Sequence, residues 1–123
     1  VYGPAVNGVL QVDTLFQDQN NAKLYNLSHY LYTQKGKGTY NYRGEWGVLD
    51  HMLVSGILLQ NENDIFTDKD WMHTFDSDLV LNYYENTYGK GNRPNRTYAG
   101  PNYFAGYSDH LDIYLHLKVK TKP

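Results

Sequence analysis

The chain has 123 residues, enough for one small domain, and 41% of them are hydrophobic, so we expect a packed core rather than a disordered chain. A formal net charge of -2 argues against a dedicated nucleic-acid-binding module, and the absence of cysteine excludes disulfides, thiolate zinc sites and cysteine nucleophiles. No apolar run approaches the length of a membrane span and no signal peptide is visible, so no membrane partner is expected and the compartment stays open.

The first third of the sequence is predicted to be helical. A first helix is expected over Pro4 to Phe16, because its apolar residues would lie near one side of a helix and its proline suits the first helical turn. A second helix is expected over Ala22 to Tyr32, where leucines and tyrosines recur at helical spacing. That helix should stop at the glycines that begin with Gly36.

Two strands are expected next. Thr39 to Arg43 alternates β-favouring residues. Trp46 to Ser55 is largely apolar on both faces, which predicts a central strand covered on both sides. Because Asp50 lies inside that strand, its carboxylate must be paired, hydrogen-bonded or placed at an exposed strand end.

The rest of the sequence predicts two further strands and a long loop between them. One strand is expected around Met72 to Phe75. Tyr83 to Phe104 is polar and rich in Gly, Asn, Pro and Tyr, and loops of that length are usually functional or mobile. Ile113 to Lys120 alternates apolar and polar residues, which is typical of a half-buried strand with one polar face.

An Asp-His pair just before the last strand is the first candidate for chemistry. Asp109 offers a hard oxygen ligand suited to Mg²⁺, and His110 offers a ring that can bind a phosphoryl oxygen or transfer a proton. An aspartate that accepts a hydrogen bond from one ring nitrogen of a histidine orients that ring. Asp50 is the candidate for this role, which requires its segment to lie beside His110.

Substrate-binding candidates lie in the basic, tyrosine-rich segment between these motifs. Arg96 could grip a phosphate with its guanidinium fork, and Tyr103 could line a binding surface. Solvated loop charges and half-buried tyrosines are the structural alternatives. The remaining histidines lack the spacing of a zinc site and are interpreted as structural or surface residues: His29, His51, His73 and His116.

Two motifs taken together resemble a known family. The segment Trp46 to Ser55 (WGVLDHMLVS), followed at a distance by Ser108 to Leu111 (SDHL), is similar to the late motifs of the endonuclease/exonuclease/phosphatase, or DNase I-like, family. Thr39-Tyr40 and Arg96-Thr97-Tyr98 also resemble elements of its bacterial members. The likeness covers nearly all of the chain from about Leu24 onward.

The resemblance implies a phosphodiester or phosphomonoester hydrolase that depends on Mg²⁺ or Mn²⁺. It assigns His110 to the contact with the scissile phosphate, Asp50 to the orientation of that histidine, and Asp109 to metal binding or water activation. The implied fold is α/β (α+β), half of a four-layer sandwich of mostly antiparallel sheets with flanking helices. Asp112 stands where the family usually has proline, which should affect only the start of the strand.

The early motifs of the same family are absent from the sequence, including the Gly-Asp-Phe-Asn strand end that supplies an acid and an amide to the site. By resemblance, residues 1–123 form the C-terminal portion of one domain, its partner is the missing N-terminal portion, and the chain alone is expected to be inactive. The alternative is a non-catalytic ligand-binding module derived from the same fold. The substrate stays open among nucleic acid, phospholipid, inositol phosphate and small esters.

Overall fold

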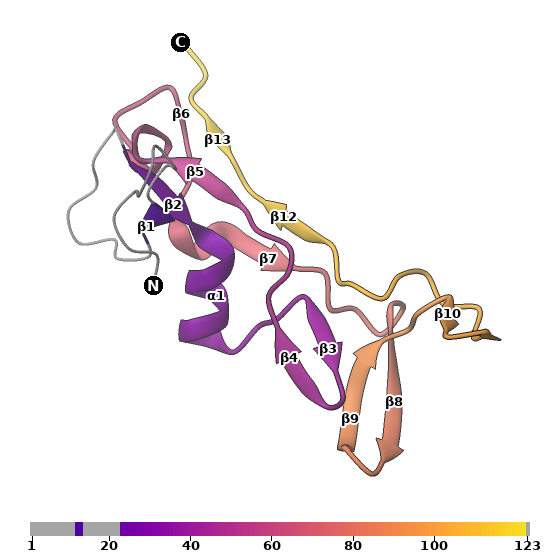
Figure 1. Ribbon diagram of the computed structural model, residues 1–123. Helices are drawn as coiled ribbons and strands as arrows, with labels where there is room; N and C mark the ends of the chain where they lie inside the picture. The colour runs from indigo at the N-terminus through magenta and orange to yellow at the C-terminus, as the bar shows by residue number, and fades with distance from the viewer. Residues whose placement is uncertain (1–11, 14–22, 123) are drawn as a thin grey trace.

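The computed structural model describes residues 12–13 and 23–122 of the chain. Over this range the protein is mixed α/β, with one α-helix, two short 3-10 helices and small, mostly antiparallel sheets (Figure 1). None of the described helices has both the length and the apolar character needed to span a bilayer. The expected mixture of helix and antiparallel sheet is therefore confirmed at this level.

The described elements follow one another as short pieces. In chain order they are β1 (Val12–Asp13), β2 (Leu24–Asn26), α1 (Leu27–Lys35), β3 (Tyr40–Tyr42), β4 (Glu45–Gly47), β5 (Leu53–Ser55), η1 (Gly56–Leu59), β6 (Ile65–Phe66), η2 (Lys69–Trp71), β7 (Met72–Thr74), β8 (Leu81–Asn86), β9 (Gly89–Pro94), β10 (Tyr98–Ala99), β11 (Asn102–Tyr103), β12 (Ile113–Leu115) and β13 (Lys118–Val119). One sheet has the order β1-β2-β5, with β1 parallel to β2. Five antiparallel pairs complete the described pairing: β3–β4, β8–β9, β10–β11, β12–β7 and β13–β6.

The helix α1 begins later than the sequence pattern predicts. Asn26 is its N-cap, and the side-chain oxygen of Asn26 accepts a hydrogen bond from the backbone N–H of His29 at 3.0 Å. The predicted start at Ala22 is wrong because residues 24–26 pair with β5 instead. The predicted stop is confirmed, since Gly36 takes the left-handed conformation at φ 66° and donates its N–H to the Tyr32 carbonyl.

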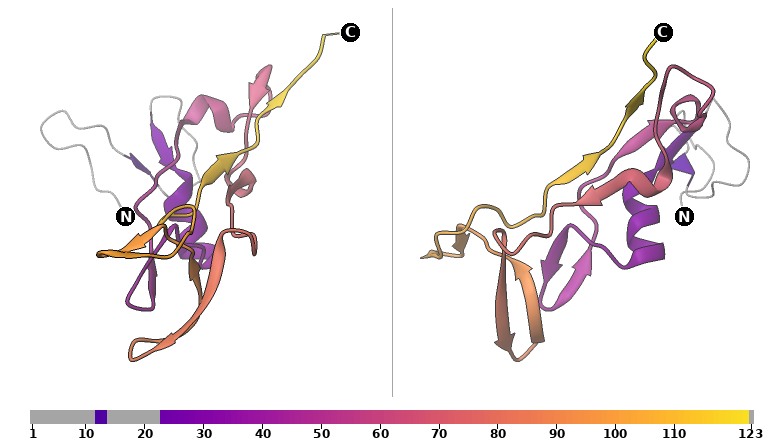
Figure 2. Two further views of the ribbon diagram at one scale, coloured as in Figure 1. Left: turned by 90° about the vertical axis from the view of Figure 1, so that its right-hand side faces the viewer. Right: turned by 180° about the vertical axis from the view of Figure 1, so that it is seen from behind.

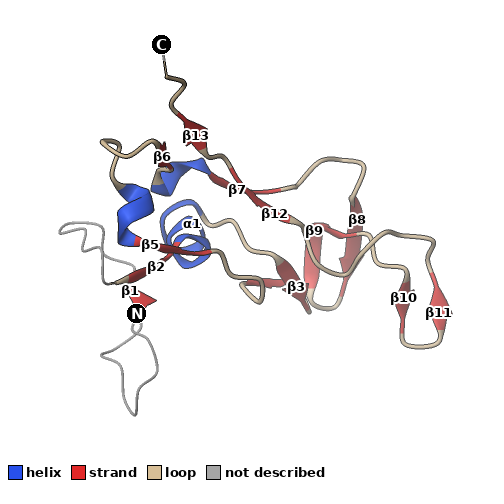
Figure 3. Cartoon of the chain, turned by 90° about the horizontal axis from the view of Figure 1, so that it is seen from above, coloured by secondary structure: helices blue, strands red, loops and turns tan. Residues whose placement is uncertain are grey.

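The apolar core lies where α1 packs against β2, β5 and β7. Its buried members are Tyr25, Leu27, Leu31, Val54, Leu59 and Met72. Seen from above, α1 is viewed nearly along its axis, with β5 and β7 passing on either side of it (Figure 3). The backbone N–H of Leu27 also donates to the Met52 carbonyl at 2.9 Å, which ties the start of the helix to the segment that carries Asp50.

The first predicted helix, Pro4 to Phe16, is wrong where the structure describes it. Residues 12 and 13 form β1 and pair in parallel with Leu24 and Tyr25 of β2. The remainder of that predicted helix lies outside the described residues. Gly8 and Asp13 already weakened the helical pattern, and a strand partner outweighs a weak helix propensity.

The predicted strand Trp46 to Ser55 is not continuous. It forms β4 and β5, separated by a stretch whose backbone is held by side chains. The N–H groups of Leu49 and Asp50 donate to Thr39 Oγ1, and the N–H of Met52 donates to Ser28 Oγ. These groups are therefore not available to a β-ladder. Nor is β5 covered on both sides, because Leu53 keeps 46% of its surface exposed.

The predicted loop Tyr83 to Phe104 is mostly strand. It contains the hairpin β8–β9, whose register runs from Leu81 opposite Pro94 to Asn86 opposite Gly89, and the small pair β10–β11. Figure 2 shows the hairpins β3–β4 and β8–β9 beside each other at one end of the molecule. The composition of this segment did not predict the hairpin, because glycine and asparagine are typical of loops, although its tyrosines favour strands.

The C-terminal segment pairs with two separate partners. The strand predicted near residues 72–75 is confirmed as β7, which pairs with β12. The predicted strand Ile113 to Lys120 is broken into β12 and β13, because His116 bonds outside a ladder. Its N–H donates to the Trp71 carbonyl, and its own carbonyl accepts from Thr67 Oγ1 at 2.7 Å.

Candidate active site

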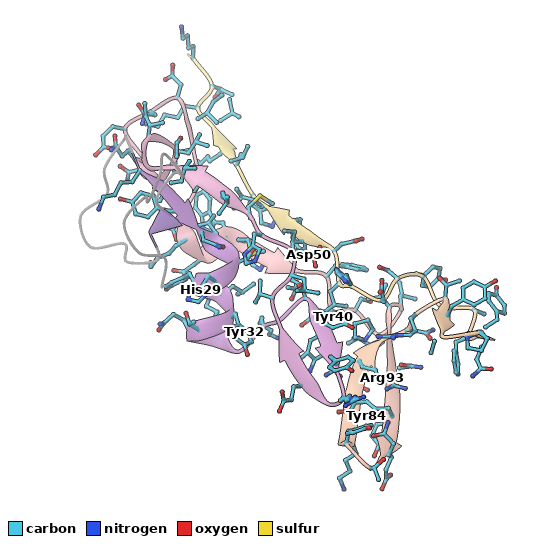
Figure 4. The ribbon with its side chains drawn as sticks, in the orientation of Figure 1. His29, Tyr32, Tyr40, Asp50, Tyr84 and Arg93 are labelled. Carbon is cyan, nitrogen blue, oxygen red and sulfur yellow. The ribbon has the colours of Figure 1, made fainter. Side chains whose placement is uncertain are left out.

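The structure brings Asp50 and His110 together across 60 residues of sequence. His110 Nδ1 lies 2.8 Å from Asp50 Oδ2. His110 forms an isolated antiparallel bridge with Tyr40 of β3, and the N–H of Leu111 donates to the Thr39 carbonyl at 2.8 Å. The two side chains therefore meet because both of their segments are attached to the start of β3, near the Asp50 and Tyr40 labels in Figure 4.

Thr39 is the residue that joins the two segments. Its side-chain oxygen accepts the N–H groups of Leu49 at 3.1 Å and Asp50 at 3.3 Å, while its carbonyl accepts from Leu111. Thr39 exposes only 1% of its surface, so these bonds are shielded from water. Sequence reasoning missed this role, and the soft likeness of Thr39-Tyr40 to family elements was the only signal pointing to it.

The Asp50 contact determines which ring nitrogen of His110 is free. An ionised carboxylate can only accept, so the ring donates from Nδ1. In the neutral ring Nε2 is then left as an acceptor, and in the protonated ring it becomes a donor. The Tyr40 ring packs against the imidazole with centroids 5.1 Å apart and planes at 64°, which further restrains the ring. About a third of each side chain is exposed, 33% for His110 and 36% for Asp50.

These groups open into a hollow that we call the His110 hollow. It has a volume of about 890 Å³ and is lined by Asp50, Phe75, Ser108, Asp109, His110, Leu111, Asp112, Ile113 and Tyr114. Asp109 is exposed and makes no hydrogen bond with another described residue, so its carboxylate is available to a ligand. Ser108 Oγ accepts the backbone N–H of His110 at 3.1 Å, which fixes the turn that presents the pair.

The loop that leads into this turn is anchored by a close backbone approach. The N–H of Tyr107 donates to the Asn95 carbonyl at 2.8 Å, and Thr97 Oγ1 donates to the Gly106 carbonyl at 2.8 Å. A Cβ at Gly106 would lie 1.8 Å from the Asn95 carbonyl oxygen, so only glycine fits there. The segment before β10 therefore positions the Asp109-His110 turn.

The two predicted substrate-binding residues lie elsewhere. Neither Arg96 nor Tyr103 lines the His110 hollow. Tyr103 is 66% exposed, and its ring lies 5.3 Å from the Tyr98 ring across the β10–β11 pair. Arg96 lines a different hollow, between the hairpins β3–β4 and β8–β9.

The four other histidines have local partners instead of a shared ligand. His51 Nδ1 lies 2.9 Å from Asn26 Nδ2. The His73 ring lies 5.2 Å from the Tyr114 ring and 5.3 Å from the His116 ring. His29 sits in α1, and burial is the largest cause that lowers its pKa.

The His110 hollow contains a suitable type of ligand for a divalent metal, but the described residues contain too few such ligands for a complete site. The carboxylate oxygen of Asp109 is the hard ligand that Mg²⁺ prefers. Within the described residues, however, no group of three histidines or acids lies close enough to hold an ion. In the described part of the chain, Asp109 therefore has the ligand type of such a site, but the described residues do not form a complete one.

The fold is a mixed α/β domain, and its site pairs an acid-held histidine with a second, exposed acid. The chain matches the endonuclease/exonuclease/phosphatase family over residues 3–119, and it belongs to that family. No curated protein and no solved structure matches it significantly. Membership places the chain in a superfamily of phosphoesterase-type hydrolases, which generally use divalent metals.

Proposed function

We propose that this chain carries the histidine side of the active site of a Mg²⁺- or Mn²⁺-dependent phosphoester hydrolase. The observation that carries the proposal is the 2.8 Å contact between His110 Nδ1 and Asp50 Oδ2, beside the exposed Asp109 in one hollow. A ring held through one nitrogen presents its other nitrogen in a fixed direction, which is what the recognition of a phosphate needs.

In the proposed reaction, water attacks phosphorus and loses a proton to Asp109 or to solvent. The bond from phosphorus to the leaving oxygen breaks, and that oxygen departs with the bonding electron pair. The protonated His110 ring donates from Nε2 to a phosphoryl oxygen and stabilises the charge that develops there. Asp50 holds the ring in this orientation. Asp109 is either the base that activates water or a metal ligand.

A bound divalent cation would neutralise charge on the phosphoryl oxygens, with Asp109 among its ligands. We propose that the other ligands come from an N-terminal portion of the same domain, which would complete the four-layer sandwich. The motifs of that portion are absent from the sequence. On this proposal the 123 residues alone are inactive or nearly so.

Arg96 and Tyr103 remain proposed substrate-binding residues, placed outside the His110 hollow. The bonds between residues 95–97 and 104–107 attach both to the loop that carries His110. They would contact parts of the substrate away from the scissile bond. The −2 net charge gives no preference for nucleic acid among the phosphoester classes.

The decisive experiment replaces His110 in a longer version of the protein that is active with Mg²⁺. His110→Ala is expected to lower the hydrolysis of bis(p-nitrophenyl) phosphate or p-nitrophenyl phosphate by roughly 10²- to 10³-fold, the usual loss for one charge-stabilising donor. His116→Ala, an exposed histidine outside the hollow, is the matched control and should retain activity. Equal activity of His110→Ala and wild type, with an unchanged melting temperature, would show that His110 takes no part in hydrolysis and would contradict the proposal.

The 123-residue chain itself provides the second measurement. With Mg²⁺ or Mn²⁺ it should hydrolyse neither ester above background, whereas the longer protein should turn over. Robust turnover by the short chain would contradict the proposal that part of the active site lies outside it.

A further inference from the structure

A second hollow, separate from the His110 hollow, lies between the two hairpins. We call it the arginine hollow. It has a volume of about 190 Å³, and three arginines line it: Arg43 from the β3–β4 turn, Arg93 from β9, and Arg96 just beyond β9. No carboxylate lines it, and no residue lines both hollows.

The three guanidinium groups keep their charge uncompensated. None of them forms an ion pair with a carboxylate in the part of the chain that the structure describes. Tyrosine rings hold two of them in place. Arg43 lies over the Tyr42 and Tyr88 rings at 5.1 Å and 5.3 Å, and Arg93 lies over the Tyr84 ring at 4.8 Å. Such contacts orient a guanidinium without neutralising it.

Asn41 leaves a hydrogen-bond donor without a partner beside these charges. It lines the same hollow and is 4% exposed. Its Oδ1 accepts the N–H of Gly44 at 3.2 Å. This bond fixes the orientation of the side-chain amide and identifies its second atom as the donor nitrogen Nδ2. Nδ2 is buried and has no acceptor among the described residues. A buried donor without an acceptor is unfavourable, and it points to an acceptor outside the described residues, such as a bound ligand.

The turn that carries Arg43 is held in an unusual conformation. Arg43 has φ 52° and Gly44 has φ 89°, the pair of positive values found in a type I′ hairpin turn. Asparagine or glycine is preferred at the first of these positions, because other side chains are strained there. A Cβ at Gly44 would lie 2.5 Å from the Tyr88 carbonyl oxygen, so the turn is packed closely against the β8–β9 hairpin.

We propose that the arginine hollow binds a phosphate group, with Arg43, Arg93 and Arg96 supplying charge and Asn41 Nδ2 supplying a hydrogen bond. Guanidinium forks match the oxygens of a phosphate, and a bound dianion removes the repulsion among three cations. The site does not rest on the proposed hydrolysis, since binding needs no turnover. Because Asn41 directly follows Tyr40, whose ring packs on His110, one strand connects the two hollows.

The test is a phosphate titration of the purified chain at constant ionic strength, followed by backbone amide NMR shifts. Inorganic phosphate should give saturable shifts at Asn41, Arg43 and Arg96. Phenyl phosphate is the second probe: similar binding indicates a site for phosphate alone, and tighter binding indicates that the Tyr42 and Tyr88 rings take the attached group. Either result supports the proposal.

Three variants decide whether the ion binds where we propose. Arg43→Asn removes a guanidinium while placing a preferred residue in the turn, so it should keep the melting temperature yet weaken binding about tenfold, as loss of one charge-assisted contact would. Asn41→Asp places a negative charge under the anion and should abolish binding. Lys118→Gln, an exposed cation on β13, should bind as wild type does.

His110→Ala separates this site from the candidate active site, and it should leave the shifts at Asn41 and Arg43 unchanged. The proposal is overturned if wild type shows no saturable shifts, if Arg43→Asn and Asn41→Asp bind phosphate like wild type, or if His110→Ala abolishes the response. The last result would place the anion in the His110 hollow and would leave the proposed hydrolase function intact.

Discussion

Tyr25, in the strand before α1, is fully buried, whereas Tyr42 and Tyr88, in the two neighbouring hairpins, expose 56% and 54% of their surfaces. Tyr25 packs into the apolar cluster with Leu27 and Met72. The hairpin tyrosines instead lie beneath an arginine and face solvent. The same residue type is therefore core in one region and surface in the other.

The difference shows that the two regions are stabilised in different ways. Around α1, removal of apolar side chains from water is the main stabilising contribution. In the β3–β4 and β8–β9 hairpins, backbone pairing and ring contacts hold the structure, with Tyr84 and Asn41 among the few buried side chains. A region with little apolar core can leave its charged and aromatic groups available to a ligand, and both hollows lie in or next to it.

The largest effect is expected from Leu27→Ala in the helical region. Leu27 is fully buried at the start of α1, so the truncation should lower the free energy of unfolding by about 2–5 kcal/mol through lost burial and a cavity. Urea denaturation measures the change. Leu79→Ala, at a position that is 73% exposed, should change stability by less than about 0.5 kcal/mol. Equal effects of the two variants would contradict the apolar core assigned to this region.

A smaller effect is expected from Thr39→Val at the base of the hairpins. Valine has nearly the same shape but no hydroxyl, so the N–H groups of Leu49 and Asp50 lose their acceptor, at a cost of about 1–3 kcal/mol. Thr39→Ser keeps the hydroxyl and should stay closer to wild type in urea denaturation. If valine and serine behave alike, the hydroxyl does not hold the Asp50 segment.

The smallest effect is a pH dependence in the helical region. Burial is the main cause that lowers the pKa of His29, and the charge of His51 adds to it. The unfolded chain therefore takes up this proton at higher pH than the folded one. The contribution to stability is complete above about pH 6.5 and is lost as the pH falls through the folded pKa. His29→Gln should reduce the loss of melting temperature between about pH 7.5 and about pH 5.5, and an unchanged loss would contradict this assignment.

Local rules predicted the elements that local chemistry determines. The stop of α1 follows from a left-handed glycine at Gly36, and the strand around Tyr40–Tyr42 follows from alternation next to a Gly-containing turn. The wrong predictions of secondary structure fall where a pairing partner that is distant in sequence determines the element. Residues 24–26 became strand because β5 lies beside them, and the hairpin β8–β9 formed in a segment whose composition resembles a loop.

The candidate site divides in the same way. Asp109 and His110 could be singled out because their residue types and their place before a strand indicate phosphate chemistry. The partnership with Asp50 was a hypothesis from family resemblance, and the structure supplies the contact. The arginine hollow was not predicted, since Arg43 and Arg93 are 50 residues apart and only the packing of two hairpins brings them together.

By itself, the sequence determined the family, the residue types available for chemistry and the position of the Asp-His pair just before a strand, because motifs and turn signals are local. Only the tertiary structure supplied the contact between Asp50 and His110 and showed where three arginines meet an unpartnered amide. Those contacts depend on Thr39 and Gly44, two small residues whose backbone neighbours lie far along the chain.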